Sequence, residues 1–311
     1  MLSTQICILR LLKVIDMKWT RRIFFFLLPG FLIFAGYQLY RGYQWKQEEK
    51  RRATYYENVR DTASPTVEVL KNVITVDHSR EQKTLHVYVP PSYSIDTSRR
   101  YPVIYMLDGG TSFNDTLSAP EWQIDEVIDN ADSLGQSAAI VIGIPSAEDR
   151  DAEYTPWIND DNPEAYGKQF AAWMANDLKD WVDRNYRTDP SVTATSIGGI
   201  SRSGMMAYYM MMAHPETYGN ALIQSPAMWV DFDRLIDMEI GEDLLGSKKI
   251  YVSVGEYEGN MMISHAEAIY DKFKEKGLSD QHLKYYLVPG EGHWNLTWRL
   301  SFKEAYPWLI E

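Results

Sequence analysis

A serine at the tip of an expected strand–turn–helix is the residue best placed to do chemistry in this chain. Ser201 stands in the run Gly199-Ile-Ser-Arg-Ser-Gly204, between the β-prone segment 191–196 and the apolar run 205–213. A sharp turn of this kind exposes the serine hydroxyl and forms a nucleophile elbow. Such a serine can attack a carbonyl carbon once a base takes its proton. Ser203 occupies the place of the last glycine in G-x-S-x-G, so the pattern is imperfect.

The C-terminal part of the chain supplies a base and two candidate acids in the order serine, acid, histidine. The segment 249–254 is typical of a strand, and Glu256 and Glu258 follow it. The segment 283–288 is the next strand, and His293 follows in a loop flanked by glycines. We expect His293 to shuttle the serine proton and Glu258 to orient the imidazole. Glu256 remains the alternative acid.

Backbone N–H groups that stabilise an oxyanion are expected at two places. One is Arg202, which follows the nucleophile at the start of the expected helix. The other lies in the loop Leu107-Asp-Gly-Gly-Thr111 after an apolar strand, where glycine lets the backbone approach a substrate carbonyl. We expect Gly110 to provide this second N–H group, with Gly109 as the alternative.

Strands and helices alternate from about residue 65, which predicts a mostly parallel sheet with helices on both faces. Together with the elbow, this pattern predicts an α/β-hydrolase fold with a twisted sheet of about eight strands. The expected strands are 66–76 and 84–90, an antiparallel pair, then 101–107, 138–144, 193–200, 220–224, 249–254 and 283–288. The expected helices are 122–131, 163–186, one after Ser203, and 264–276.

The N-terminal part has a different character. Residues 23–40 are apolar and long enough to span a bilayer, and Lys18, Arg21 and Arg22 precede them. We divide the chain into a basic segment (1–22), a transmembrane or signal-anchor helix (23–40), a linker (41–64) and a catalytic domain (65–311). A cleaved signal peptide and a soluble amphipathic segment are the alternatives. Basic residues flank both sides, so the positive-inside rule is weak here, but we expect an inner-membrane anchor with a periplasmic catalytic domain.

Charge and cysteine content restrict the partners. The net charge is −12, with +7 in residues 1–52 and −19 in the remainder. An acidic catalytic domain is a poor candidate for nucleic-acid binding. Cys7 is the only cysteine, so one chain cannot form a disulfide or a cysteine-based zinc site. We expect a small-molecule substrate and a membrane contact through the N-terminal helix.

An ordered set of motifs from about residue 66 to the C-terminus resembles the esterase D and enterochelin-esterase-like family. The motifs are Tyr101-Pro-Val-Ile-Tyr-Met-Leu-Asp-Gly109, Val141-Ile-Gly-Ile-Pro145, Arg150 with Glu153-Tyr-Thr-Pro156, Gly199-Ile-Ser-Arg-Ser-Gly204, Ser225-Pro226 with Trp229, and Gly292-His293 with Trp298. The resemblance implies an α/β-hydrolase that cleaves or transfers esters without a metal or organic cofactor. By position, it implies Ser201 as nucleophile, His293 as base, Glu258 as acid and Gly110 as an oxyanion donor.

The resemblance leaves the substrate open. Siderophore trilactones and aromatic or acyl-sugar esters are the expected classes. Arg150, Tyr154, Trp157 and Trp294 are the candidates for the substrate pocket, although for Arg150 we favour a pair with Glu153 that shapes the loop. We expect a serine carboxylic-ester hydrolase that works through an acyl-enzyme. An acyltransferase of the same fold and a non-catalytic, membrane-tethered binding protein are the alternatives.

Overall fold

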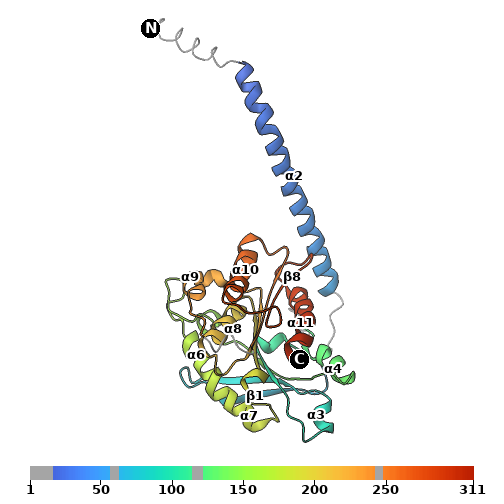
Figure 1. Cartoon of the computed structure of the whole chain (residues 1–311), viewed down its shortest axis with the longest axis vertical. Helices are drawn as coiled ribbons and strands as arrows, with labels where there is room; N and C mark the ends of the chain where they lie inside the picture. Colours follow the sequence, from blue (N-terminus) through green and yellow to red (C-terminus); the bar gives the residue numbers. More distant parts are fainter. Residues whose placement is uncertain (1–16, 57–62, 114–121, 242–247) are drawn as a thin grey trace. The chain divides into compact units, whose positions relative to one another are not determined.

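The computed structural model describes residues 17–56, 63–113, 122–241 and 248–311 (Figure 1). The chain divides into two compact units, Met1–Asn58 and Val59–Glu311. The described part of the first unit is one long helix, and the second unit contains the sheet with its covering helices.

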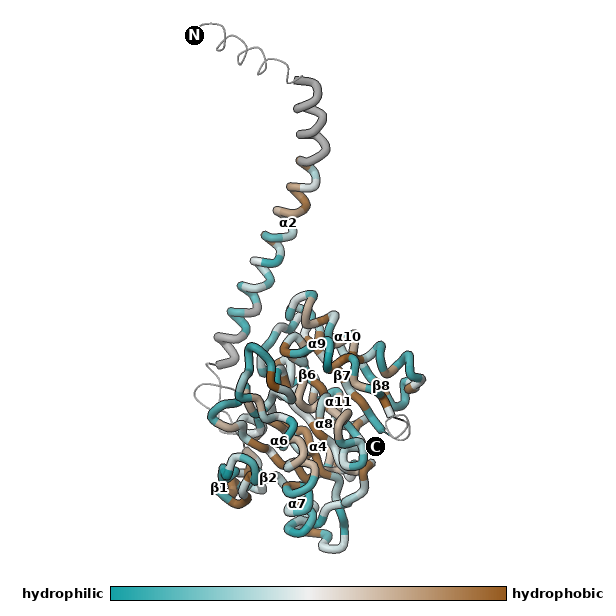
Figure 2. The backbone as a smooth tube through the Cα atoms, turned by 90° about the vertical axis from the view of Figure 1, so that its left-hand side faces the viewer, coloured by the Kyte–Doolittle hydropathy of each residue, from teal (hydrophilic) through white to brown (hydrophobic). Residues whose placement is uncertain are grey.

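The helix of the first unit is α2 (Met17–Tyr56), which includes the predicted span 23–40 and continues through residues 41–56 of the expected linker. Phe31 and Ile33 are 66% and 74% exposed on it. In Figure 2 the coloured part of α2 changes from apolar to hydrophilic along the chain. Among the residues whose placement is described, no helix combines the length and hydropathy of a membrane crossing. Side chains 17–27 lie outside that description.

The second unit is built on an eight-stranded sheet with the order β1-β2-β4-β3-β5-β6-β7-β8. The β1–β2 and β2–β4 pairs are antiparallel, and the other five pairs are parallel. The mostly parallel sheet is therefore confirmed. The strands are β1 (Val67–Thr75), β2 (Gln82–Tyr88), β3 (Val103–Leu107), β4 (Ile140–Ile144), β5 (Thr195–Ile200), β6 (Asn220–Gln224), β7 (Lys249–Gly255) and β8 (Leu283–Val288).

Burial explains the composition of the central strands. Every residue of β3, β4, β5 and β6 is buried, as expected for a parallel sheet that helices cover on both faces. Their apolar runs lack the alternation of a half-exposed strand. Figure 2 shows this apolar centre with more hydrophilic segments around it. Each large apolar side chain buried here contributes about 1.5–3 kcal/mol to folding.

Helices cover both faces of this sheet. α4 (Ile124–Ser133) packs against α11 (Asn295–Ile310), while α8 (Ser201–Ala213) packs on β5 and β6, and α10 (Asn260–Glu275) packs on β7 and β8 (Figure 1). From β3 the chain first crosses to β4, and after β4 it returns past β3 to β5 and continues toward β8. Because crossovers are right-handed, this reversal places α4 on the opposite face of the sheet from α8 and α10. Ligands bind outside the carboxyl ends of strands at such a reversal. Here those ends are Leu107 of β3 and Ile200 of β5.

Shorter helical segments complete the connections between the strands. They are α3 (Ser92–Ile95), η1 (Gly109–Thr111), α5 (Arg150–Glu153), α6 (Gly167–Trp173), η2 (Met174–Leu178), α7 (Lys179–Asn185), η3 (Val192–Ala194), η4 (Met228–Val230) and α9 (Phe232–Ile236).

All four expected helices have other bounds than predicted: α4 spans Ile124–Ser133 rather than 122–131, and α10 spans Asn260–Glu275 rather than 264–276. The helix expected over 163–186 begins at Gly167, and its middle, η2, is π-helical. α8 begins at Ser201 itself rather than after Ser203. The sequence analysis missed α11, because Pro307 and polar residues interrupt the pattern of its buried face.

Candidate active site

Ser201 lies at the elbow between β5 and α8 in a conformation unusual for its residue type. Its φ is +53°, in the left-handed region that L-residues with a side chain rarely adopt. Such backbone strain costs about 1–3 kcal/mol and is concentrated at functional sites. A Cβ on Gly199 would lie 2.3 Å from the carbonyl oxygen of Ser203, so only glycine fits there. The tight turn therefore presents Ser201 at the carboxyl edge of the sheet.

Ser203 makes specific contacts in the position where the elbow pattern has glycine. Its hydroxyl accepts a bond from the Ile200 N–H at 3.0 Å. The same oxygen lies 2.6 Å from Asp108 Oδ2 and 2.8 Å from the Ile200 carbonyl oxygen. A hydroxyl has one proton to donate, and the carboxylate is the stronger acceptor. Ser203 thereby ties the elbow to the loop after β3.

His293 and Glu258 lie together on the loops after β8 and β7. The distance between His293 Nδ1 and Glu258 Oε2 is 2.7 Å. A carboxylate only accepts, so Nδ1 carries the proton and Nε2 is the nitrogen that can accept another. His293 is 40% exposed, whereas the carboxylate is fully buried. This is the geometry of a base oriented by an acid.

Glu258 is satisfied by donors on its other oxygen. Oε1 accepts bonds from Ser225 Oγ at 2.6 Å and from the Gly255 N–H at 2.8 Å. These bonds compensate for the cost of burying a carboxylate. Glu256 points elsewhere and accepts the Gly290 N–H at 2.7 Å. The structure thus places Glu258, and not Glu256, against His293.

Ser225 and Trp298 support this pair, and the sequence analysis assigned neither a role. Trp298 Nε1 donates to Ser225 Oγ at 3.1 Å, and the Ser225 hydroxyl in turn donates a hydrogen bond to Glu258 Oε1. The Trp298 ring meets the His293 ring edge-to-face, with centroids 5.2 Å apart. Both residues occur in the motifs of the family resemblance, but no local spacing signals their contacts.

Among the described residues, no hydrogen bond joins Ser201 to His293. Hydrogen bonds between catalytic residues are often long in the free enzyme and tighten only when substrate binds.

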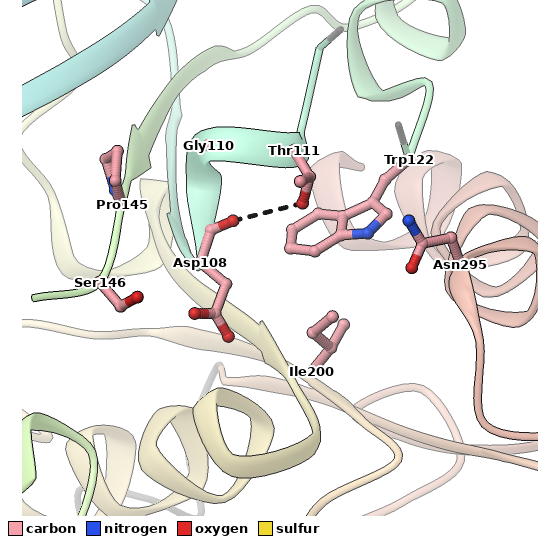
Figure 3. A pocket seen from close by; sticks show the side chains of 8 residues that line it. All are labelled: Asp108, Gly110, Thr111, Trp122, Pro145, Ser146, Ile200 and Asn295. Atoms are coloured by element: carbon pink, nitrogen blue, oxygen red, sulfur yellow. Dashed lines mark hydrogen bonds between the residues drawn. The ribbon is translucent and has the colours of Figure 1, made fainter. Parts of the chain in front are cut away.

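The loop after β3 is shaped by close backbone packing. Asp108 has φ +57°, and a Cβ on Gly109 would lie 2.2 Å from the Gly143 Cα. Gly109 is therefore buried, whereas Gly110 lines a cavity of about 370 Å³ (Figure 3). At the elbow, the backbone N–H of Arg202 lies in the first turn of α8, where no carbonyl of the same helix can accept a hydrogen bond from it. Gly110 and Arg202 are thus the better placed of the predicted oxyanion donors.

Two arginines of the site are held by carboxylates, and one partner differs from expectation. Arg150 makes a bidentate pair with Asp108, with nitrogen–oxygen distances of 2.9 and 2.6 Å. The expected Arg150–Glu153 pair is wrong, because Glu153 is buried and pairs instead with Lys83 at 2.6 Å. Burial lowers the pKa of Arg202, while the Asp151 carboxylate, 2.9 Å from its Nε, opposes that shift.

The aromatic candidates for the substrate pocket make contacts within the fold. Tyr154 is fully buried, and its hydroxyl accepts the Asp108 N–H at 3.1 Å. Burial raises the pKa of Tyr154 well above its usual value, so the hydroxyl stays neutral. Trp294 is also buried and donates to Glu291. Trp157 is half-buried and packs edge-to-face on Tyr209. Neither Tyr154 nor Trp294 is among the residues that line the cavity beside Gly110, and their place in the substrate pocket stays a prediction.

Comparison with known proteins agrees with this geometry. The family model described as "Putative esterase" matches residues 79–309. The chain belongs to this esterase family. It is therefore a hydrolase whose reaction class is carboxylic-ester cleavage. The protein YbbA of Bacillus subtilis is 21% identical over 246 residues, which cover 75% of this chain and 94% of YbbA.

Solved structures share the fold at low sequence identity. The BES protein from Bacillus cereus superimposes with a TM-score of 0.65 at 20% identity, over 81% of this chain and 97% of that protein. The enterobactin esterase FES from Shigella flexneri, solved in the presence of enterobactin, gives a TM-score of 0.63 at 17% identity. That match covers 79% of this chain and 60% of the Shigella protein. These similarities establish the α/β-hydrolase-like fold of the second unit.

Proposed function

We propose that this protein hydrolyses carboxylic esters through a Ser201–His293–Glu258 triad and an acyl-enzyme intermediate. One observation carries the proposal. A buried Glu258 holds the Nδ1–H of His293 at 2.7 Å, on loops at the same sheet edge as the strained elbow of Ser201. This arrangement leaves His293 Nε2 to act as the base.

The reaction follows from these positions. His293 Nε2 takes the Ser201 proton as Oγ bonds to the ester carbonyl carbon, and the carbonyl oxygen becomes an anion. The N–H groups of Gly110 and Arg202 stabilise that anion. His293 then gives its proton to the leaving alcohol as the ester C–O bond breaks. Water, activated by the same imidazole, releases the acid and restores Ser201.

The first test is hydrolysis of 4-nitrophenyl butyrate by Ser201→Ala. Loss of turnover together with loss of fluorophosphonate labelling at position 201 is the expected result. Ser264→Ala, whose hydroxyl bonds to the Met261 carbonyl on the exposed side of α10, is the matched control and should keep full activity. Unchanged turnover in Ser201→Ala would overturn the assigned nucleophile.

We further propose trilactone and aromatic or acyl-sugar esters as the substrates to test first. The similarity to a Shigella enterobactin esterase supports the first class. A panel of enterobactin, feruloyl sugars, acetylated xylan and short acyl esters ranks them by kcat/KM. Product analysis with and without a sugar acceptor separates hydrolysis from acyl transfer.

We also propose that residues 23–40 anchor the protein in the inner membrane, with the second unit in the periplasm. The apolar run with basic residues before it supports this, as does the exposure of Phe31, Leu32, Ile33 and Phe34 on α2. Retention in the membrane fraction after carbonate extraction, with the second unit digestible in spheroplasts, is the expected result. A protein released by carbonate would contradict the anchor.

A further inference from the structure

A cavity of about 370 Å³ adjoins the proposed oxyanion loop. Figure 3 shows its walls, which come from the loop after β3, the loop after β4, the end of β5 and the start of α11. Ile200, which precedes the nucleophile, and Gly110 both line it. A volume of this size lies in the lower part of the range for small-ligand pockets. Its position beside the reacting carbonyl suits one side of an ester.

Trp122 lines this cavity and is only 2% exposed. Its indole Nε1–H has no hydrogen-bond partner among the residues that the structure describes. Figure 3 shows that nitrogen on the side of the ring nearest Asn295, which also lines the cavity. Leaving a buried N–H unpaired is unfavourable, and native proteins rarely leave one unused.

The other buried tryptophans of the described chain behave differently. Trp173 donates to the Thr75 carbonyl oxygen, Trp294 to Glu291 and Trp298 to Ser225. Each of these three N–H groups is satisfied by the fold itself. Trp122 is therefore the exception: its ring lines the cavity at the site, and a ligand oxygen reaches its buried Nε1–H once the neighbouring lining shifts.

The charge of the lining limits what can accept this bond. Asp108 is the one charged residue among the described residues that line the cavity. Its two carboxylate oxygens are engaged by Arg150 and Ser203. The remaining walls are apolar or carry hydroxyl and amide groups, as at Pro145 and Ser146. No free cation lines the described walls to compensate an anionic ligand, so a neutral ligand group fits best.

We propose that this cavity is a specificity subsite that binds a neutral ether, hydroxyl or carbonyl group of the ester substrate. The oxygen of that group accepts the Nε1–H bond of Trp122. The inference deepens the proposed function and rests on it. A site built to donate a hydrogen bond discriminates against an analogue of the same shape that lacks the acceptor.

The test compares ester pairs that differ by one oxygen in place of one methylene. In the acyl series these are 4-nitrophenyl methoxyacetate and 4-nitrophenyl butyrate. In the alcohol series they are 2-methoxyethyl acetate and n-butyl acetate, followed by acid release. Trp122→Phe removes the donor and keeps an aromatic ring. In one of the two series, the kcat/KM of the oxygenated ester divided by that of the plain ester should fall about 3- to 10-fold in the variant. Intrinsic reactivity cancels because the same esters meet both enzymes.

Two controls keep the result interpretable. Trp181→Phe makes the same ring change on α7, beside Tyr186, and should leave both ratios unchanged. If Trp122→Phe folds poorly, benzothienylalanine at position 122 removes only the N–H. A fall in the acyl series assigns the cavity to the acid part, and a fall in the alcohol series assigns it to the leaving group. Unchanged ratios in both series overturn the subsite while leaving the Ser201 proposal intact. Activity retained in Ser201→Ala overturns the proposed function instead.

Discussion

The two sides of the candidate site are held by different kinds of contact. The acid–base side, formed by Glu258, His293 and Ser225, is organised around a fully buried carboxylate bonded to neutral donors. The oxyanion side, formed by the loop after β3, Arg150 and Ser203, is organised around Asp108, which is 15% exposed and paired with a cation. The first side orients a proton carrier, so its geometry affects the chemical step directly. The second side positions backbone N–H groups through intervening contacts.

Removing the acid should therefore have the largest effect. We expect Glu258→Gln to lower kcat by about 10³- to 10⁴-fold, because an amide can present a donor to His293 Nδ1 and favour the wrong tautomer. Steady-state hydrolysis of 4-nitrophenyl butyrate measures this loss. Glu256→Gln, on the same loop, is the matched control and should stay within about twofold of the wild type, a difference below about 0.5 kcal/mol. Equal losses in both variants would remove the distinction between the two glutamates.

The second largest effect should come from the buried ion pair between Lys83 and Glu153. Lys83 and Glu153 are 2% and 1% exposed, and Glu153 also accepts the Ala147 N–H at 2.7 Å. Lys83→Met leaves an unpaired buried carboxylate and should lower the free energy of unfolding by about 3–5 kcal/mol at pH 7. Urea denaturation measures it.

The same pair provides an internal check through pH. Burial raises the pKa of Glu153, and Lys83 opposes that shift. In Lys83→Met the folded-state pKa rises further, so the loss is largest above that pKa and shrinks as the pH falls through it. Lys83→Met with Glu153→Gln keeps an acceptor for Ala147 and should recover most of the stability. A loss independent of pH would show that packing, not charge, is responsible.

Ser203 should have a smaller effect on the oxyanion side. Ser203→Gly restores the G-x-S-x-G pattern but removes the hydroxyl that lies 2.6 Å from Asp108. One lost hydrogen bond to a carboxylate, partly compensated by Arg150, should lower kcat about 3- to 10-fold with little change in KM. Ser133→Ala, exposed at the end of α4, is the control. A faster Ser203→Gly enzyme would contradict the positioning role of the hydroxyl.

The smallest effect should be a loss of stability at acid pH, caused by histidines away from both sides of the candidate site. Burial lowers the pKa of His86, and likewise the pKa values of His78 and His265. The unfolded chain therefore binds protons more readily than the folded chain. The contribution of these histidines to the free energy of unfolding is full above pH 6.5, their ordinary pKa, and falls as the pH drops below that value. His86→Gln should flatten the fall in urea midpoint between pH 7 and 5. An equally steep fall would exclude His86 as a contributor.

The sequence analysis succeeded where local spacing carries the information. The parallel strands are continuous apolar runs, and the elbow of Ser201 is a contiguous motif, so both are readable along the chain. It failed for contacts between loops. Three contacts of Asp108 are of this kind: the pair with Arg150, the bond to the buried Tyr154 hydroxyl and the bond with Ser203. Each joins residues from different strand ends.

The sequence by itself determined the order of the strands, the elbow and the candidacy of Ser201 and His293, because hydrophobic period and turn chemistry are local. Only the tertiary structure decided that Glu258 and not Glu256 meets His293. It also decided that Trp122, alone among the buried tryptophans of the described residues, keeps an unpaired N–H. Both depend on which side chains the folded sheet brings to one edge, and no spacing along the chain encodes that meeting.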